Sequence, residues 1–165
     1  IGLCGLDGGL FQAEQLNEKY GLVGEVVKVD AAPVFDALNC GYIPVVSTVA
    51  QGLDADTAYN INADTAAAKL ATALEAERLL LLTDVRGLLR DPKDESTLIP
   101  ELQLSAVPAL EREGVISGGM IPKVDCCVES VRSGVKSAVI LDGRVAHSIL
   151  IELLSDAGIG TMLIS

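Results

Sequence analysis

Aromatic residues and positive charges are both scarce in this chain of 165 residues. It has no tryptophan, two phenylalanines and three tyrosines, so aromatic residues make up only 3% of the sequence. A buried core must therefore consist of Val, Leu, Ile and Ala, which suits parallel strands buried on both faces and covered by helices. The formal net charge of −11 disfavours nucleic acid and anionic membranes as partners.

Long apolar runs and paired cysteines are also missing. The aliphatic run 79–82 has the length of a strand and is far shorter than the ~20 residues that span a bilayer. The cysteines, Cys4, Cys40, Cys126 and Cys127, include no C-x-x-C pair, so neither a zinc site nor a disulfide framework is indicated. We expect reduced thiols that behave as small apolar side chains.

The start of the chain and its length bear on its organisation. It begins Ile1-Gly2-Leu3 with neither an initiating methionine nor a signal-peptide pattern, and we expect a segment of a longer polypeptide. The length suits one domain, at most with two lobes. Apolar runs typical of strands alternate with amphipathic runs typical of helices, which predicts an α/β fold with right-handed crossovers and a mainly parallel sheet.

Glycine and proline mark the ends of most of the predicted elements. Strands are predicted at 24–30, 42–49, 79–83, 137–141 and 161–164. Helices are predicted at 33–40, 64–77, 104–113, 120–133 and 147–155. The segment 50–58 is predicted to be a polar loop, and the charged segment 86–97 is predicted to be an exposed loop.

Polar segments follow the predicted strands at 50–64, 83–89 and 142–144. In open α/β sheets ligands bind beyond the carboxyl ends of the strands, so these segments are candidate binding loops. In the second of them Gly87 lets backbone amides approach a nucleotide, while Asp84 can reach a ribose, an adenine amino group or a metal-bound water. The alternative is a plain turn in which Asp84 caps neighbouring amides.

Two amides and a carboxylate stand at the start of the predicted helix 64–77. Asn60 and Asn62 alternate in an extended segment, which can place both amides on the same side. Amides suit a substrate that itself carries carboxylates and an amide. The alternative is an Asx turn with an N-cap for the helix, in which Asp64 complements the helix dipole.

Lys123 falls in the first turn of the predicted helix 120–133. The glycines Gly118 and Gly119 directly precede this helix. A cation at this position opposes the helix dipole unless an anion is near, so Lys123 is a candidate for phosphate binding. The alternative is a solvent-exposed lysine. His147 is the single histidine, and it has no serine or cysteine beside it in a nucleophile motif, so triad chemistry is not indicated.

Taken together, these motifs resemble the amino acid kinase family over essentially the whole chain. The matching segments are Tyr59-Asn60-Ile61-Asn62-Ala63-Asp64, Leu81-Leu82-Thr83-Asp84-Val85-Arg86-Gly87, Gly118-Gly119-Met120-Ile121-Pro122-Lys123 and 147–162. The resemblance implies a three-layer αβα sandwich of the carbamate kinase-like type, with 1–77 ending the acyl-acceptor half and 78–165 forming the nucleotide-binding half. It implies ATP-dependent phosphorylation of the γ-carboxylate of N-acetyl-L-glutamate, in arginine biosynthesis, with Mg²⁺ held mainly by the ATP phosphates.

The resemblance also implies a role for each matching residue. Asn60 and Asn62 would bind N-acetylglutamate, Lys123 would neutralise the transferring phosphoryl group, and Asp64 would orient the catalytic lysines. The nucleotide would be bordered by Asp84, Val85, Arg86, Gly87, Leu88, Leu89, Val115, Ile116 and Ser117. The family's glycine-rich loop, second lysine and substrate-binding arginine have no counterpart here, so we expect them upstream of Ile1 and the site of this chain alone to be incomplete.

The end of the chain resembles the arginine-sensitive branch of the family. His147, Glu152, Gly158 and Gly160 are the candidates for binding arginine, since a glutamate can pair with a guanidinium in a bidentate way. The alternative is a surface helix followed by a glycine turn. The resemblance further implies a homo-oligomer, with a hexamer as one form, and a location in the cytoplasm or the plastid stroma. The segment 90–94, together with Cys126-Cys127, resembles members from oxygenic phototrophs and implies binding of the signalling protein PII.

Two other functions remain open at this level. One is a sibling kinase of the same family that acts on another carboxylate or on a nucleotide. The other is a non-catalytic module that binds a nucleotide or a partner protein.

Overall fold

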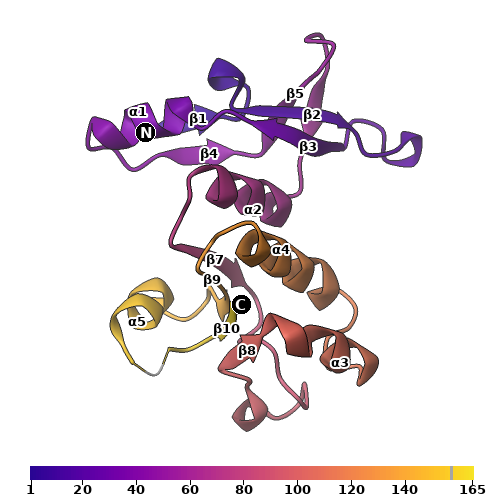
Figure 1. The fold of residues 1–165 in the computed structure, drawn as a ribbon, viewed down its shortest axis with the longest axis vertical. Helices are drawn as coiled ribbons and strands as arrows, with labels where there is room; N and C mark the ends of the chain where they lie inside the picture. The colour runs from indigo at the N-terminus through magenta and orange to yellow at the C-terminus, as the bar shows by residue number, and fades with distance from the viewer. Residues whose placement is uncertain (157) are drawn as a thin grey trace. The chain divides into compact units, whose positions relative to one another are not determined.

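The computed structural model describes residues 1–156 and 158–165 (Figure 1). By its internal contacts the chain divides into two compact units, Ile1–Leu74 and Glu75–Ser165. Each unit has its own four-stranded sheet. Among the described residues, no helix is long and apolar enough to cross a membrane.

The sheet of the first unit has the strand order β3-β2-β5-β6. The β2–β3 and β5–β6 pairs are antiparallel and the β2–β5 pair is parallel, while β1 and β4 form a separate parallel pair. The strands are β1 (Gly2–Cys4), β2 (Phe11–Gln15), β3 (Gly24–Val29), β4 (Val45–Ser47), β5 (Val49–Gly52) and β6 (Ala58–Asn60). The helices are α1 (Ala32–Asn39), α2 (Ala63–Ala73) and the short 3₁₀ helices η1 (Asp7–Gly9) and η2 (Glu18–Tyr20).

The core of the first unit is aliphatic apart from one ring. Phe11 is 1% exposed and is the only aromatic side chain among the buried members of this cluster. Small residues from α2 and β5 complete the cluster, among them Ala66 and Ala50, and α2 packs against β3. This confirms the expectation that the core would be built without many aromatic side chains.

The sheet of the second unit has the strand order β7-β9-β10-β8. β9 runs parallel to β7 and antiparallel to β10, and β10 runs parallel to β8. The strands are β7 (Arg78–Thr83), β8 (Glu101–Gln103), β9 (Ser137–Asp142) and β10 (Thr161–Ile164). The helices are α3 (Val107–Arg112), α4 (Met120–Arg132) and α5 (Ser148–Leu154), with the 3₁₀ helices η3 (Glu95–Thr97) and η4 (Leu104–Ala106).

The two faces of this second sheet differ. α4 packs against β7, β9 and β10, and the strand residues that alternate toward one face, such as Leu81 and Leu163, are buried (Figure 1). On the opposite face, Met162 is paired with Glu101, and Arg78 begins β7 in the same alternation. Arg78 and Glu101 are exposed and Met162 is half-buried. One face is therefore sealed, and the other has room for a ligand.

Most predicted strands and helices are confirmed, with differences in the first unit. The predicted strand 42–49 is divided between β4 and β5, which belong to different sheets. The predicted loop 50–58 is wrong at both ends, because β5 and β6 extend into it as a hairpin. The turn between them is held by Asp54, whose carboxylate accepts hydrogen bonds from the backbone N–H groups of Asp56 and Thr57 at 3.1 and 3.0 Å. The helix predicted at 64–77 ends at Ala73, since Glu75 adopts a positive φ of 51°.

The direction of β10 is the main difference in the second unit. A single helix between two strands predicts a crossover to a parallel strand, but β10 runs antiparallel to β9. Thr161, the first residue of β10, is paired with Ile140 near the end of β9. The connection through α5 therefore keeps the chain at the end of the sheet where β9 finishes, and β10 runs back along β9.

The first prediction concerns the close approach of Gly160 to β9. A Cβ atom at Gly160 would lie 2.4 Å from the backbone oxygen of Ile140, so Gly160→Ala should lower the free energy of unfolding by at least about 1–3 kcal/mol. Gly119→Ala is the matched control, because a Cβ there meets no atom within 4 Å. Urea unfolding of the two variants tests this, and an equal loss in both would contradict the packing argument.

Candidate functional site

The loop after β7 is held by hydrogen bonds at both of its ends. The Thr83 hydroxyl accepts a hydrogen bond from the Val85 N–H at 3.1 Å and donates one to the Val85 carbonyl at 2.9 Å. Further along the loop, the N–H of Leu88 donates to the buried Thr161 hydroxyl at 2.9 Å. Between them, Gly87 has a φ of +149°. The loop is therefore fixed at both ends, and at Gly87 it adopts a backbone conformation that only glycine adopts easily.

A cavity of about 190 Å³ lies between this loop and the segment that precedes α4. Its lining is mostly aliphatic: Val85, Gly87, Leu88, Leu89, Pro92, Val115, Ser117 and Met120. The fold thus brings together two of the predicted nucleotide-binding segments. Of the other predicted nucleotide-binding residues, Asp84 and Arg86 line a neighbouring pocket, and Ile116 is buried with 2% exposure.

The neighbouring pocket, of about 480 Å³, is surrounded by charges. Arg144 donates from Nε and Nη2 to the two carboxylate oxygens of Asp142 at 2.9 and 2.8 Å. These hydrogen bonds lower the pKa of Asp142 from 3.8 to about 2. Because the folded pKa is the lower one, the pair stabilises the fold above about pH 4, and this contribution is lost as the pH falls toward 2. Arg86 and Glu95 form a more exposed pair at 2.8 Å.

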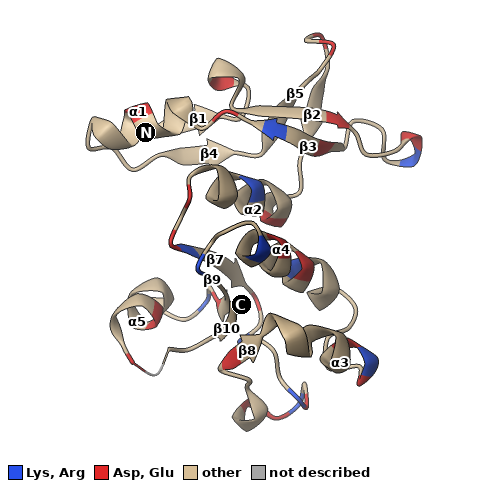
Figure 2. Ribbon diagram, viewed as in Figure 1, with Lys and Arg blue, Asp and Glu red and all other residues tan. Residues whose placement is uncertain are grey.

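The start of α4 is suited to an anion. Gly118 adopts a positive φ of 55°, and Gly119, at the N-cap, has no side chain with which to cap the helix. Met120, the first residue of α4, lines the 190 Å³ cavity, and Lys123 follows in the first turn, half-buried. Figure 2 shows basic residues on α4 among acidic ones. A helix N-terminus and a lysine side chain both favour phosphate.

In the first unit, the predicted substrate residues lie at the junction of β6 and α2. Asn60 is the last residue of β6, and Asn62 is the N-cap of α2. The Asn62 Oδ1 atom accepts hydrogen bonds from the N–H groups of Asp64 and Thr65 at 3.0 and 3.2 Å. The N-cap that the sequence left as the alternative is therefore present, and it uses the amide oxygen. A cavity of about 330 Å³ borders this helix start at Ala63.

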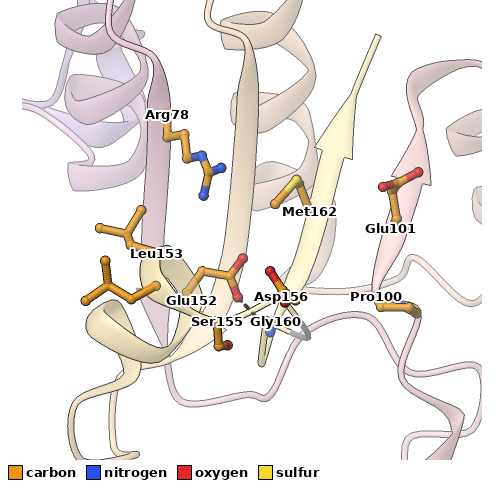
Figure 3. A pocket seen from close by; sticks show the side chains of 11 residues that line it. Arg78, Pro100, Glu101, Glu152, Leu153, Ser155, Asp156, Gly160 and Met162 are labelled. Atoms are coloured by element: carbon orange, nitrogen blue, oxygen red, sulfur yellow. Dashed lines mark hydrogen bonds between the residues drawn. The ribbon is translucent and has the colours of Figure 1, made fainter.

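A pocket of about 520 Å³ lies in the second unit on the open face of the sheet (Figure 3). Its charged lining comes from β7, β8, α5 and the segment after α5: Arg78, Glu101, Glu152 and Asp156. Glu152 is only 5% exposed. Its Oε2 atom accepts hydrogen bonds from the N–H groups of Ile159 at 2.8 Å and Gly160 at 3.4 Å.

The structure brings together three of the four residues predicted for arginine. Glu152, Gly158 and Gly160 all line the 520 Å³ pocket, and Gly158 has a positive φ of 60°. His147 lies at the N-cap of α5, where it is exposed and is not among the pocket-lining residues. Arg78 and Glu101 were not predicted. A basic residue at the start of the otherwise aliphatic strand 79–82 was the available signal for Arg78.

The charges of this pocket define the ligand that it could accept. One guanidinium faces the carboxylates of Glu101, Glu152 and Asp156, so the lining is net negative. A ligand with one carboxylate and more than one positive charge would complement it. Among the described residues, no group of three or more His, Cys, Asp or Glu side chains could hold a metal ion.

An α/β fold with ligand cavities at strand ends and at a helix N-terminus is typical of nucleotide-binding proteins. The chain belongs to the amino acid kinase family, whose sequence model matches residues 1–142. It is 59% identical over 165 residues to the acetylglutamate kinase of Clostridium beijerinckii. That match covers 99% of this chain and 58% of the relative, so the chain spans little more than half of the curated relatives that it matches.

Solved structures agree with this membership. The N-acetylglutamate synthase from Neisseria gonorrhoeae, in complex with coenzyme A and L-arginine, superposes with a TM-score of 0.83 at 25% identity, over 98% of this chain and 37% of that one. The carbamate kinase from Giardia lamblia bound to AMP-PNP reaches 0.63 at 23% identity, over 86% of this chain and 46% of that one, and shows the fold alone. The predicted family and fold class are confirmed.

The second prediction separates the capping role of Asn62 from any other. Asn62→Ala should lower the free energy of unfolding by about 1 kcal/mol, because the N–H groups of Asp64 and Thr65 lose their acceptor. Asn62→Asp keeps an acceptor oxygen and is the matched control, with a change of a few tenths of a kcal/mol at most. Urea unfolding measures both, and equal losses would show that the side chain acts in some other way.

Proposed function

We propose that this chain is part of an ATP-dependent kinase that phosphorylates the γ-carboxylate of N-acetyl-L-glutamate in arginine biosynthesis. Support comes from relatives named acetylglutamate kinase, at 51–59% identity over nearly the whole chain. The observation that carries the proposal is the 190 Å³ cavity of the second unit, which is bordered by the first residue of α4. It joins an apolar compartment to a helix start that favours phosphate.

The second unit would bind ATP. The aliphatic lining around Val85, Leu89 and Val115 suits a flat purine ring, and a cavity of this size would hold the base alone. The phosphates would then extend toward the start of α4, where Lys123 would balance the charge that develops on the transferring group. Mg²⁺ would be held mainly by the phosphates, as the resemblance to the family implies.

The first unit would bind the acyl acceptor. Asn60 and the amide nitrogen of Asn62 would bind N-acetylglutamate, beside the start of α2 and its positive dipole end. Asp64 would orient the lysines that neutralise the phosphates. No general base is required, because the attacking γ-carboxylate has an ordinary pKa near 4.3 and is already ionised at neutral pH. Catalysis would consist of in-line positioning and charge neutralisation.

We propose that the domain consists of an acyl-acceptor half and a nucleotide-binding half. Residues 1–77 would end the acyl-acceptor half and 78–165 would form the nucleotide-binding half, close to the contact boundary at Leu74. A homo-oligomer, binding of PII, and a location in the cytoplasm or plastid stroma rest on the sequence resemblance alone. They stay predictions.

The experiment that tests the reaction traps the acyl phosphate with hydroxylamine in the presence of ATP, Mg²⁺ and N-acetylglutamate. It compares the chain itself with a hybrid that adds the part of the Clostridium beijerinckii relative outside the match. Hydroxamate from N-acetylglutamate, but not from glutamate, aspartate or UMP, is expected from the hybrid. No such product would reject the proposal. Product from a competitor would indicate a sibling kinase, and nucleotide binding without turnover would indicate a non-catalytic module.

The third prediction uses Lys123 in the active hybrid. Lys123→Ala should lower kcat by about 100-fold or more, because a positive charge at the transferring phosphoryl group is lost. Lys136→Ala is the control, since that lysine is exposed and pairs with Glu77 at 2.6 Å. Initial-rate kinetics measure both variants. An unchanged kcat in Lys123→Ala would remove this lysine from the transition state.

We further propose that the 520 Å³ pocket binds arginine as a feedback inhibitor. Arg78 would bind the α-carboxylate of the ligand, and Glu152 and Glu101 would bind its guanidinium and ammonium groups. The structurally similar Neisseria gonorrhoeae synthase is in complex with L-arginine, which supports arginine as a ligand of this chain. His147, which lies outside this lining, would contribute only after a rearrangement of the start of α5.

The fourth prediction tests this pocket. Glu152→Gln keeps an oxygen that can accept from the Ile159 N–H but removes the charge, so arginine should bind about 10- to 100-fold more weakly. Glu113→Gln, an exposed position after α3, is the matched control. Calorimetric titration with arginine, and with the uncharged analogue citrulline, measures the effect. Equal affinity of arginine and citrulline for the unaltered protein would show that the pocket does not recognise the charge of the guanidinium group.

A further inference from the structure

Thr161 has an unusual position in the second unit. It is the first residue of β10 and is completely buried, although its side chain is polar. Its Oγ1 atom accepts a hydrogen bond from the Leu88 N–H at 2.9 Å and donates one to the Ile99 carbonyl at 2.7 Å. One hydroxyl therefore satisfies two backbone groups from segments that are distant in sequence.

The segments of Leu88 and Ile99 are also hydrogen-bonded to each other beside the hydroxyl. The N–H of Ile99 donates to the Leu88 carbonyl at 2.9 Å. Gly87 approaches so closely that a Cβ atom there would lie 2.6 Å from the Thr161 Oγ1. Leu88 itself is 1% exposed and lines the 190 Å³ cavity. Close-packed groups of this kind transmit small displacements.

On its other side, Thr161 continues directly from the loop that Glu152 binds. The Glu152 Oε2 atom accepts from the N–H groups of Ile159 and Gly160, at 2.8 and 3.4 Å. Gly160 is pressed against β9, since a Cβ atom there would lie 2.4 Å from the Ile140 oxygen. The segment 159–161 therefore joins the carboxylate of one pocket to the wall of the other.

We propose that Thr161 is a positioning residue that couples the 520 Å³ pocket to the 190 Å³ nucleotide cavity. The proposal rests on the proposed function, in which arginine occupies the first and ATP the second. A cation at Glu152 competes with the Ile159 and Gly160 amides for the carboxylate, and the start of β10 shifts in response. The two hydrogen bonds of Thr161 then carry the shift to Leu88 and so to the cavity wall.

Such coupling is reciprocal, because each ligand must change the affinity of the other by the same factor. Arginine, which draws the carboxylate away from the loop, should weaken nucleotide binding. The nucleotide should weaken arginine binding equally. The hydroxyl is required for the effect, because its two hydrogen bonds connect the start of β10 to the segments of Leu88 and Ile99.

The experiment measures AMP-PNP binding by calorimetry with and without saturating arginine, on the full chain. The unaltered protein and Thr161→Ser, which keeps the hydroxyl, should show a change in affinity of about 5-fold or more. Thr161→Val has a similar shape but lacks the hydroxyl that holds the Leu88 N–H, so it should bind the nucleotide alone more weakly. Arginine should change that affinity by a factor near 1. Coupling retained in folded Thr161→Val would overturn the proposal, as would a factor of 1 in the unaltered protein when both ligands bind.

A second measurement does not depend on the valine variant folding. In the unaltered protein, arginine should shift the amide NMR signal of Leu88, while the signal of Leu110, buried in α3, should stay in place. An unshifted Leu88 signal at saturating arginine would overturn the coupling. Absence of arginine binding to the unaltered protein would instead reject the arginine pocket itself, and the coupling with it.

Discussion

The second unit depends on the complete burial of β9 between β7 and β10. All six residues of this strand are buried, so its position and register admit little variation. The register places Thr83 beside Asp142 and Thr161 beside Ile140. The loops that follow β7 and β9 and the start of β10 consequently meet at one edge of the sheet. The 190 Å³ cavity borders the loop that follows β7, and the 520 Å³ pocket borders the segment that leads into β10.

The chemistry of the pockets follows from the strong negative charge of the chain. A protein with a net charge of −11 attracts an anionic nucleotide poorly at long range, so it must rely on local donors. The positive dipole end of α4 and the charge of Lys123 favour an anion beside an aliphatic cavity. The carboxylates around Arg78 do the opposite and favour a cationic ligand. The second unit thereby has one pocket that favours an anionic ligand and another that favours a cationic ligand.

Sequence reasoning succeeded where a residue acts through its neighbours in the chain. The helix that carries Lys123 and the strand 137–141 both depend on local spacing. It missed Arg78 and Glu101, which are distant from Glu152 in the sequence and reach the pocket only through the sheet. For Asn62, both interpretations were local, and only hydrogen-bond geometry showed that the side chain caps α2.

The sequence by itself determined the α/β class, the aliphatic core and the family, because these depend on hydrophobic periodicity, composition and short motifs. The tertiary structure alone decided the direction of β10, since no local pattern shows at which end of β9 the chain that leaves α5 joins the sheet. That direction brings Thr161 against the loop of Leu88 and places the open face of the sheet under α5 and the loop that follows it. Contacts between residues 73 positions apart follow from packing, and no local pattern encodes them.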